Sequence, residues 1–336
     1  MDSLTQLTLG VAVAEATIGK KVGRKASLWG AILGTFPDLD VFIPMGHAVD
    51  NFTYHRSFSH SLIVLSIVAP LFVWLIRKIH PNDSVSWKNW FATVYLVLIT
   101  HPILDSFTVY GTQLFWPITE YPVSIGSVFI IDPAYTLPLL LGVFLYVVFS
   151  QKKWAYYANL IGIGVTSVYL IWSFVVQQQF HIKAKIQFLK NNTEFDRILV
   201  QPTPINTLLW RIVAINDEGY LVGYRSVFDE PGDIVFRQYD SDESLLEKIE
   251  EHPPVKRLKW FTHGFYRVFE RDGKIVISDL RMGLEPDGYV FQFAVGERAP
   301  DGIQAITPER VEAPRSFDQA GKLFKRIVDQ DAPMTW

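Results

Sequence analysis

Long apolar segments alternate with short polar ones over the first half of the chain. Six apolar runs cover residues 4–19, 27–36, 61–76, 90–104, 128–150 and 156–176. A helix needs about 20 residues to cross a bilayer, so the later runs approach that length and the first three are short. The pattern predicts an α-helical polytopic membrane bundle, in which neighbouring helices cover the shorter runs.

The pattern changes after Gln179, where polar residues become frequent and turn signals appear. Asn-Asp-Glu-Gly at 216–219, Asp-Gly at 272–273 and Asp-Gly at 287–288 separate β-rich runs. We expect a hairpin over residues 268–278, strands over 221–228 and 289–295, and a short helix over 241–251 with Ser241 as its N-cap. Residues 180–192 are expected to extend the last apolar helix into water. These patterns predict two domains, a transmembrane helical domain over 1–179 and a soluble, β-rich α+β domain over 180–336.

Charge and composition support this division. The first 179 residues contain ten Lys or Arg and nine Asp or Glu, whereas the rest contain 21 of the 31 basic and 25 of the 34 acidic residues. A net charge of −3 with mixed signs gives no reason to expect nucleic acid as a partner. Cysteine is absent, which excludes disulfides and thiolate metal ligands. The N-terminus has no basic region or cleavage site, so no removable signal peptide is expected.

Basic loops predict the orientation of the bundle. The clusters at 20–25, 77–88 and 152–153 fall on one side if every apolar run crosses the membrane in turn, and the positive-inside rule makes that side cytoplasmic. The C-terminal domain and the polar motifs described next would then lie on the extracytoplasmic, or periplasmic, side. A re-entrant hairpin formed by the first two runs would change this count.

Histidine and aspartate residues gather at the ends of the apolar runs on the predicted outer side. Imidazole and carboxylate groups are ligands for zinc, manganese and iron. Ionisable groups are costly near hydrocarbon, so such a cluster indicates a functional site. We predict one or two divalent ions, with zinc favoured over manganese or iron, held by residues from this set: Asp38, Asp40, His55, His60, His101 and Asp105.

The spacing of these residues gives partial geometry. His101 and Asp105 are four residues apart and would share one face of a helix, although Pro102 is expected to interrupt it. His55 is expected in a loop and His60 at a helix start, with Ser57 or Ser59 as the cap.

Asp38, Asp40 and Arg56 could have further roles in the chemistry. Asp38 and Asp40 alternate along an extended or turn segment, so one could bind the metal while the other bridges or orients a ligand. Arg56 could hold an anionic group such as a phosphate.

Further polar residues have two interpretations each. Glu15 lies inside an apolar run, should face the bundle interior and could contact the site. Asp132 precedes Pro133 and suits a helix cap as well as a site residue. The remaining histidines are expected on the surface or in loops: His47, His80, His181, His252 and His263.

Several motifs together are similar to a known family. They are Met-Asp-Ser-Leu-Thr-Gln at 1–6, Gly-Thr-Phe-Pro-Asp-Leu-Asp at 34–40, His-Arg-Ser-Phe-Ser-His-Ser at 55–61, His-Pro-Ile-Leu-Asp at 101–105 and Tyr-Gly-Thr-Gln-Leu-Phe-Trp-Pro at 110–117. They resemble the membrane-bound metal-dependent hydrolases, also described as LexA-binding, inner-membrane-associated hydrolases of the YdjM type. The resemblance covers about the first 150 residues. It implies a bacterial inner-membrane protein with the six histidines and aspartates above as metal-site residues. In many members of that family a histidine occupies the position of Gln6.

The sequence thus favours a membrane-embedded, metal-dependent hydrolase. Activated water would attack an ester or phosphoester, for which a lipid-linked substrate is one option, with membrane lipids as partners, Asp38 or Asp40 as general base and Arg56 holding the anion. One alternative is a non-catalytic, metal-stabilised membrane scaffold that binds a protein partner. A second is a transporter with Glu15, Asp105 and the histidines as an ion path. The runs 62–73 and 137–148 contain almost no polar residue, which disfavours the transporter.

Overall fold

The structure is a computed structural model that describes residues 1–150, 152–313 and 318–334. Residue contacts divide the chain into two units. The first, here called the helical unit, comprises Met1–Ile43 and Arg56–Phe174, and the second, the β-rich unit, comprises Pro44–His55 and Val175–Trp336. An N-terminal helical region is therefore followed by a domain of antiparallel sheets, as the sequence predicts. The division falls a few residues before Gln179 and also assigns 44–55 to the β-rich unit.

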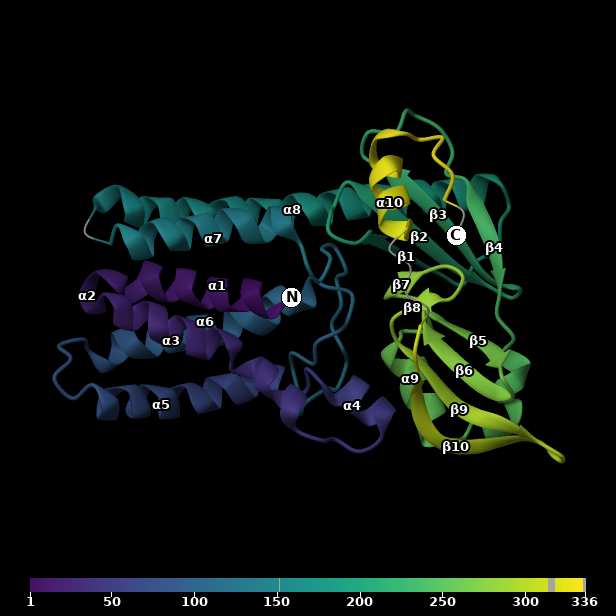
Figure 1. Cartoon of the computed structure of the whole chain (residues 1–336), viewed down its shortest axis with the longest axis horizontal. Helices are drawn as coiled ribbons and strands as arrows, with labels where there is room; N and C mark the ends of the chain where they lie inside the picture. Colours follow the sequence, from purple (N-terminus) through teal and green to yellow (C-terminus); the bar gives the residue numbers. More distant parts are fainter. Residues whose placement is uncertain (151, 314–317, 335–336) are drawn as a thin grey trace. The chain divides into compact units, whose positions relative to one another are not determined.

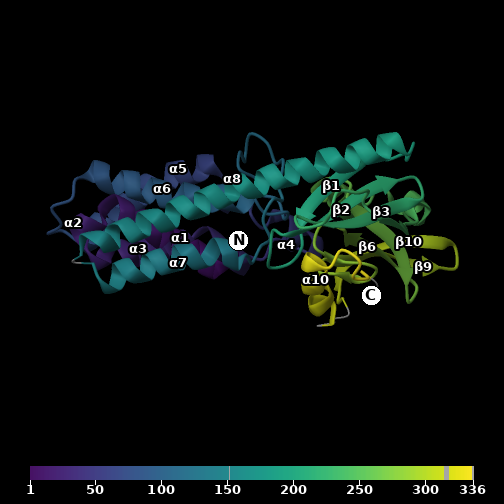
Figure 2. The same ribbon diagram turned by 90° about the horizontal axis from the view of Figure 1, so that it is seen from above.

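Each predicted apolar run forms a helix. The elements are α1 (Ser3–Ala14), a π-helical turn (Glu15–Gly19), α2 (Lys20–Val22), α3 (Arg24–Thr35), α5 (Leu62–Ile79), α6 (Trp87–Ser106), α7 (Pro133–Val148) and α8 (Lys153–Lys190). Helix α1 packs against α3, α6 and α7, and α5 packs against α6 (Figures 1 and 2). The extension of the last apolar helix beyond residue 180 is confirmed, because α8 continues to Lys190.

Two of the described helices, α5 and α8, are long and apolar enough to cross a membrane by their length and composition. Helix α7 is apolar but shorter. The multi-pass arrangement of the bundle stays a prediction.

Glycines bring α1 and α3 into direct backbone contact. A Cβ atom on Gly10 would lie 2.3 Å from the carbonyl oxygen of Gly30, and one on Gly30 would lie 2.5 Å from the carbonyl oxygen of Gly10. One turn further along α3, a Cβ on Gly34 would lie 2.8 Å from the carbonyl oxygen of Gln6. Small residues allow this close approach. The glycine contact therefore fixes the end of α3 beside the start of α1.

Helix α6 continues through Pro102, and the predicted interruption is wrong. Proline removes one backbone hydrogen bond and crowds the preceding turn. The bonds on either side and the packing of buried neighbours such as Leu98 and Leu104 hold the helix together. As a result, His101 and Asp105 remain on one helical face.

The β-rich unit contains two four-stranded antiparallel sheets. The first has the order β1-β2-β3-β4 (Arg197–Pro202, Leu209–Asn216, Gly219–Ser226, Phe236–Asp240). The second has the order β10-β9-β6-β5 (Gly302–Val311, Gln292–Ala299, Lys274–Asp279, Tyr266–Arg271). A short pair, β7 (Gly283–Leu284) and β8 (Gly288–Tyr289), and the helices α4 (Ala48–Tyr54), α9 (Pro253–Phe261) and α10 (Asp318–Val328) complete the unit.

Most local predictions for this unit are confirmed, with adjusted ends. The expected hairpin is β5 and β6, paired around Asp272 and Gly273. The expected strand at 289–295 is split between β8 and β9. The short acidic helix is a 3-10 helix, Glu243–Ile249, capped by Asp242 instead of Ser241. The Ser241 hydroxyl accepts a hydrogen bond from the amide of Val268, so it is not available as a cap.

Candidate metal centre

Three separate segments of the helical unit bring two imidazoles and two carboxylates together. Asp38 belongs to a 3-10 helix that begins at Pro37 and follows α3, and His60 ends a 3-10 turn directly before α5. His101 and Asp105 come from successive turns of α6. Each of these four residues offers one ligand atom, and the four atoms lie within 4.8 Å of one another. The group could hold a metal ion.

Five of the six distances between these atoms suit tetrahedral coordination, and the sixth, between the carboxylate oxygens of Asp38 and Asp105, is within 4.8 Å. Nε2 of His60 lies 3.2 Å from Nε2 of His101 and 3.3 Å from Oδ2 of Asp105. The latter oxygen is 3.5 Å from Nε2 of His101. Oδ1 of Asp38 is 3.4 Å from each imidazole Nε2. Zinc binds nitrogen and oxygen at about 2.0–2.1 Å, and a tetrahedron of that size has edges of about 3.3–3.4 Å. These residues therefore fit a zinc-sized ion.

Outer partners orient both imidazoles. Nδ1 of His101 lies 2.6 Å from the carbonyl oxygen of Gly34, so this nitrogen donates its proton and Nε2 keeps a free lone pair. Nδ1 of His60 lies 2.9 Å from the hydroxyl of Ser59, which donates to Oδ2 of Asp40 at 2.6 Å. Metal-binding histidines usually have such a partner at the second nitrogen. Both rings thus present Nε2 to the shared centre.

Asp40 supports the site from outside the group of four. Its carboxylate is buried and accepts hydrogen bonds from Ser59 and, at 3.0 Å, from the amide of Arg56. Oδ2 of Asp40 lies 3.7 Å from Nδ1 of His60, on the far side of that ring from Nε2. Of the two predicted aspartates, Asp38 therefore faces the centre and Asp40 faces a ligand.

His55 is not brought to the centre among the described residues. It follows α4 as its C-cap and belongs to the β-rich unit, whereas Arg56 begins the next segment of the helical unit. The predicted cap at Ser57 or Ser59 is replaced by Ser61, whose hydroxyl accepts from the amides of the first turn of α5. Helix α5 therefore begins only after His60.

Asp105 has several further partners. Its Oδ1 accepts a hydrogen bond from Nε2 of Gln6 at 2.8 Å and contacts the amino group of Met1. Nε of Arg56 lies 3.3 Å from Oδ2. Family resemblance had singled out position 6, but no sequence pattern marks the amino group of Met1. These donors hold the carboxylate with Oδ2 directed at the two imidazoles.

Arg56 is itself held firmly. Its side chain is almost fully buried, Nη1 donates to the hydroxyl of Thr108 at 3.3 Å, and the guanidinium lies 5.0 Å from the ring centroid of Tyr110. The backbone of Arg56 has φ of 64°, a left-handed conformation that is uncommon for residues other than glycine. The predicted anion-binding arginine thus lies beside a candidate ligand, in a constrained conformation.

Asp38 is the only partly exposed member of the group of four. Its side chain is 21% exposed, whereas those of His60, His101 and Asp105 are at most 1% exposed. Its Oδ1 lies 3.4 Å from Nε2 of each imidazole, so the exposed side of this carboxylate borders the centre. The centre is therefore closest to solvent at Asp38.

Glu15 and Asp132, each of which has two interpretations in the sequence, lie outside the group of four. Glu15 is buried and accepts a hydrogen bond from Ser27. Asp132 caps α7, accepting from the amide of Ala134 at 3.0 Å and from the hydroxyl of Tyr169 at 2.8 Å. The capping interpretation of Asp132 accounts for the backbone contact, and the bond from Tyr169 ties α8 to the same carboxylate.

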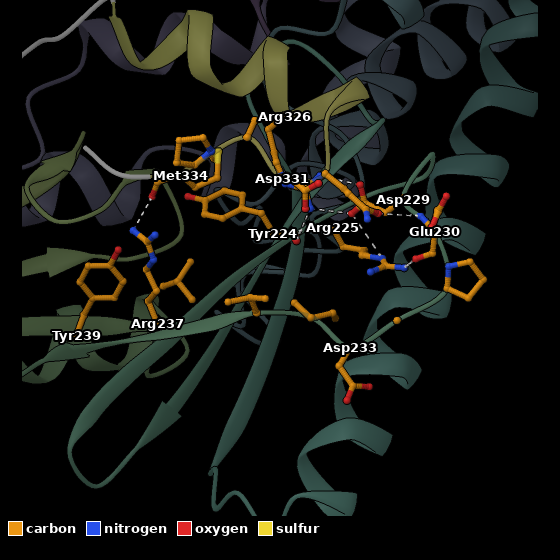
Figure 3. A pocket seen from close by; sticks show the side chains of 18 residues that line it. Tyr224, Arg225, Asp229, Glu230, Asp233, Arg237, Tyr239, Arg326, Asp331 and Met334 are labelled. Carbon is orange, nitrogen blue, oxygen red and sulfur yellow. Dashed lines mark hydrogen bonds and ion pairs between the residues drawn. The ribbon is translucent and has the colours of Figure 1, made fainter.

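A pocket of about 490 Å³ lies in the β-rich unit, between β3, β4 and the segment that follows α10 (Figure 3). Its charged side chains bind one another. Arg326 donates to both oxygens of Asp229, at 2.7 and 2.8 Å, and Arg237 donates to the carbonyl of Met334 at 3.1 Å. These contacts hold the C-terminal segment against the sheet, so we interpret the pocket as part of the fold.

Comparison with known proteins places this arrangement in a family. The sequence model of the YdjM inner membrane protein family matches residues 1–180, which include the whole candidate centre. The chain is 35% identical to the inner membrane protein YbcI of Escherichia coli (strain K12) over 102 residues, or 30% of this chain and 57% of that protein. It is 24% identical to the protein YfhP of Bacillus subtilis (strain 168) over 237 residues, or 66% of this chain and 68% of that one. No solved structure matches the chain. Because the family match covers more than half of its length, the chain belongs to the YdjM inner membrane protein family.

Proposed function

We propose that this protein is a membrane-embedded hydrolase that uses one divalent metal ion, of the zinc type, to cleave an ester or phosphoester. The observation that carries the proposal is the compact set of four ligand atoms with oriented imidazoles. Two neutral imidazoles with two carboxylates are a ligand set that zinc accepts. An ion held there would supply the Lewis acidity that activates water at neutral pH.

The residues around the ion would have three roles: general base, support of an imidazole, and binding of an anionic substrate. Asp38 is the partly exposed carboxylate; its Oδ1 would bind the ion, and its second oxygen, which is not in the group of four ligand atoms, is our candidate general base for an incoming water molecule. Asp40 and Ser59 keep the ring of His60 in place. Two carboxylates balance the charge of a divalent ion, which leaves the guanidinium of Arg56 as excess positive charge for an anionic substrate.

Features around the centre support a lipid-linked substrate. Helix α5, one of the two candidate spans, begins two residues after His60, so the centre lies at the end of an apolar helix. Val41 and Phe42, in the segment that carries Asp38, are 67% and 80% exposed, and Ile118 is 81% exposed. Exposed apolar side chains of this kind suit contact with lipid. We propose that the substrate is a phosphate-containing lipid or another lipid-borne ester.

The arrangement of the helical unit supports a periplasmic centre and a multi-pass topology. Figure 1 shows α2, the α5–α6 connection and the α7–α8 connection at one end of the unit, opposite the start of α1. These connections contain the basic residues 20–25, 77–88 and 152–153. The positive-inside rule makes that end cytoplasmic and the metal end extracytoplasmic.

Release of phosphate from lipid substrates tests the proposed hydrolase activity. We expect the full-length protein in detergent with zinc to release phosphate from members of a panel of lipid phosphomonoesters and lipid-linked diphosphates. We expect Asp105→Asn to lose at least 100-fold in rate, because Oδ2 of Asp105 is a ligand atom and Nδ2 of asparagine is not. Glu120→Gln, at an exposed carboxylate, is the matched control and should keep full activity.

One observation favours a second function. Four protein ligands would close a tetrahedral site, as in structural zinc centres, whereas catalytic centres keep one position open. If zinc binds stoichiometrically and no panel member is cleaved, or if cleavage is unchanged in Asp105→Asn, the metal-stabilised scaffold is the better description.

A further inference from the structure

Glu15 is a second buried acid of the helical unit that the metal centre does not use. The residue is 1% exposed and opens the π-helical turn Glu15–Gly19 between α1 and α2. Single π turns within α-helices occur frequently at functional sites. The acid group therefore occupies an irregular turn deep within packed helices.

The two oxygens of Glu15 have different surroundings. Oε1 accepts a hydrogen bond from the hydroxyl of Ser27 on α3, whereas Oε2 is buried and lies near the hydroxyl of Tyr146 on α7. A Cβ atom on Gly19 would lie 2.0 Å from this Oε2 and 2.8 Å from the hydroxyl oxygen of Tyr146 on α7. Because Gly19 has no side chain, Oε2 occupies the space that a Cβ atom would fill, next to the hydroxyl of Tyr146. We call this space the Gly19 cradle.

No cation among the described residues forms an ion pair with Glu15. The ammonium of Lys20 lies over the ring of Tyr156 instead, 3.4 Å from the ring centroid. An unpaired carboxylate in such surroundings is strongly disfavoured, and a buried acid neutralises itself by taking up a proton or a cation. Oε2, beside the hydroxyl of Tyr146, is the atom that would receive it.

The backbone of the turn favours a proton over a metal cation. Metal cations with oxygen ligands need several of them, and carbonyl groups released by an irregular turn are common donors. The carbonyls here are already bonded: the hydroxyl of Thr17 donates to Val13 and Ala14 at 2.9 and 3.0 Å, and the hydroxyl of Tyr156 donates to Ala16 at 3.3 Å. Few oxygens remain to surround a metal ion at Oε2.

We propose that Glu15 is a proton-binding site, a neutral carboxylic acid at neutral pH whose proton sits on Oε2 in the Gly19 cradle beside the hydroxyl of Tyr146. The site is separate from the candidate metal centre and does not depend on metal or on hydrolysis. It gives the helical unit a group that can take up and release a proton.

Infrared spectroscopy of the full-length protein in detergent at pH 7 tests the proposal. A neutral carboxylic acid gives a C=O stretching band that an ionised carboxylate lacks. We expect the wild type to show this band, Glu15→Gln to lose it, and Glu120→Gln, at an exposed carboxylate, to keep it. The band should shift when water is replaced by deuterium oxide. An identical band in wild type and Glu15→Gln, or no band in the wild type, overturns the proposal.

Two further measurements test the cradle and the identity of the ligand. Gly19→Ala places a methyl group at the position of Oε2 and is expected to shift or abolish the band. Gly164→Ala is the matched control because its Cβ would meet no atom within 4 Å. Replacing choline by sodium in the buffer should leave the band unchanged. Loss of the band in sodium, or an unchanged band in Gly19→Ala, contradicts the proton site as described.

Discussion

Replacing His60 by alanine removes one of the four ligand atoms at the candidate metal centre. Structural zinc sites have apparent binding free energies of about 10–16 kcal/mol. Divided equally among four ligands, this is roughly 2.5–4 kcal/mol for one imidazole, or on the order of 10²–10³-fold in Kd. Both imidazoles lie at tetrahedral distances from their neighbours, so we expect the loss for His60→Ala to fall in this range.

The outer partner of the same ring provides a graded comparison. Ser59→Ala removes the hydroxyl between Nδ1 of His60 and Asp40 while leaving all four ligand atoms in place. Loss of such a partner typically costs about 10–100-fold in metal affinity. We therefore expect the order of affinity to be wild type, then Ser59→Ala, then His60→Ala. His181→Ala, at a histidine outside the group of four, should match the wild type.

Competition with a chromogenic chelator measures these affinities on purified, full-length protein. Melting temperatures with and without zinc provide a second readout, because metal at 100 times its Kd stabilises the folded state by about 2.7 kcal/mol. Equal affinity in wild type and His60→Ala would refute the assignment of His60 as a ligand. Ser59→Ala keeps all four ligand atoms. Equal zinc affinity in the wild type and Ser59→Ala would therefore refute the role of the Ser59 hydroxyl.

Two further predictions concern packing and pH. Gly30→Ala should destabilise the protein by about 1–3 kcal/mol through overpacking against Gly10, whereas Gly164→Ala, which meets open space, should be neutral or gain up to ~1 kcal/mol in helix propensity. Melting temperatures of the two variants measure the difference. Equal shifts in melting temperature would contradict the close contact between Gly30 and Gly10. Burial raises the pKa of Asp229, but the hydrogen bonds from Arg326 outweigh burial and lower this pKa. The contribution of Asp229 to stability is therefore complete above pH ~4 and is lost as the pH falls through the lowered pKa. Acid unfolding below pH ~4 should be less steep in Asp229→Asn than in the wild type, and identical unfolding curves would contradict this.

Periodicity was sufficient to predict the helices and one half of the candidate centre. A spacing of four residues places His101 and Asp105 on one helical face, and all six apolar runs form helices. The hairpin of β5 and β6 followed from its Asp-Gly turn. These features depend on neighbours within a few residues, which the sequence displays directly.

Other features depend on how separate segments meet. Asp38 and Asp40 are equivalent candidates in the sequence, and only the packing of their 3-10 helix against the turn at His60 decides which faces the centre. The placement of His55 in the β-rich unit could not be predicted from spacing, because the next residue, Arg56, already belongs to the helical unit. Helix α6 also tolerates Pro102 through packing that the sequence does not reveal.

The acceptor that orients His101 is a main-chain oxygen, that of Gly34. No side-chain replacement at that position can delete this oxygen, so the protonation pattern of the imidazole depends on where α3 lies. Because α3 is positioned by bare backbone against α1, a slip of either helix by a fraction of a turn would move the oxygen and leave Nδ1 without its acceptor. The glycine contact between these helices thus sets the orientation of a metal-site imidazole, although neither contact surface carries a ligand atom.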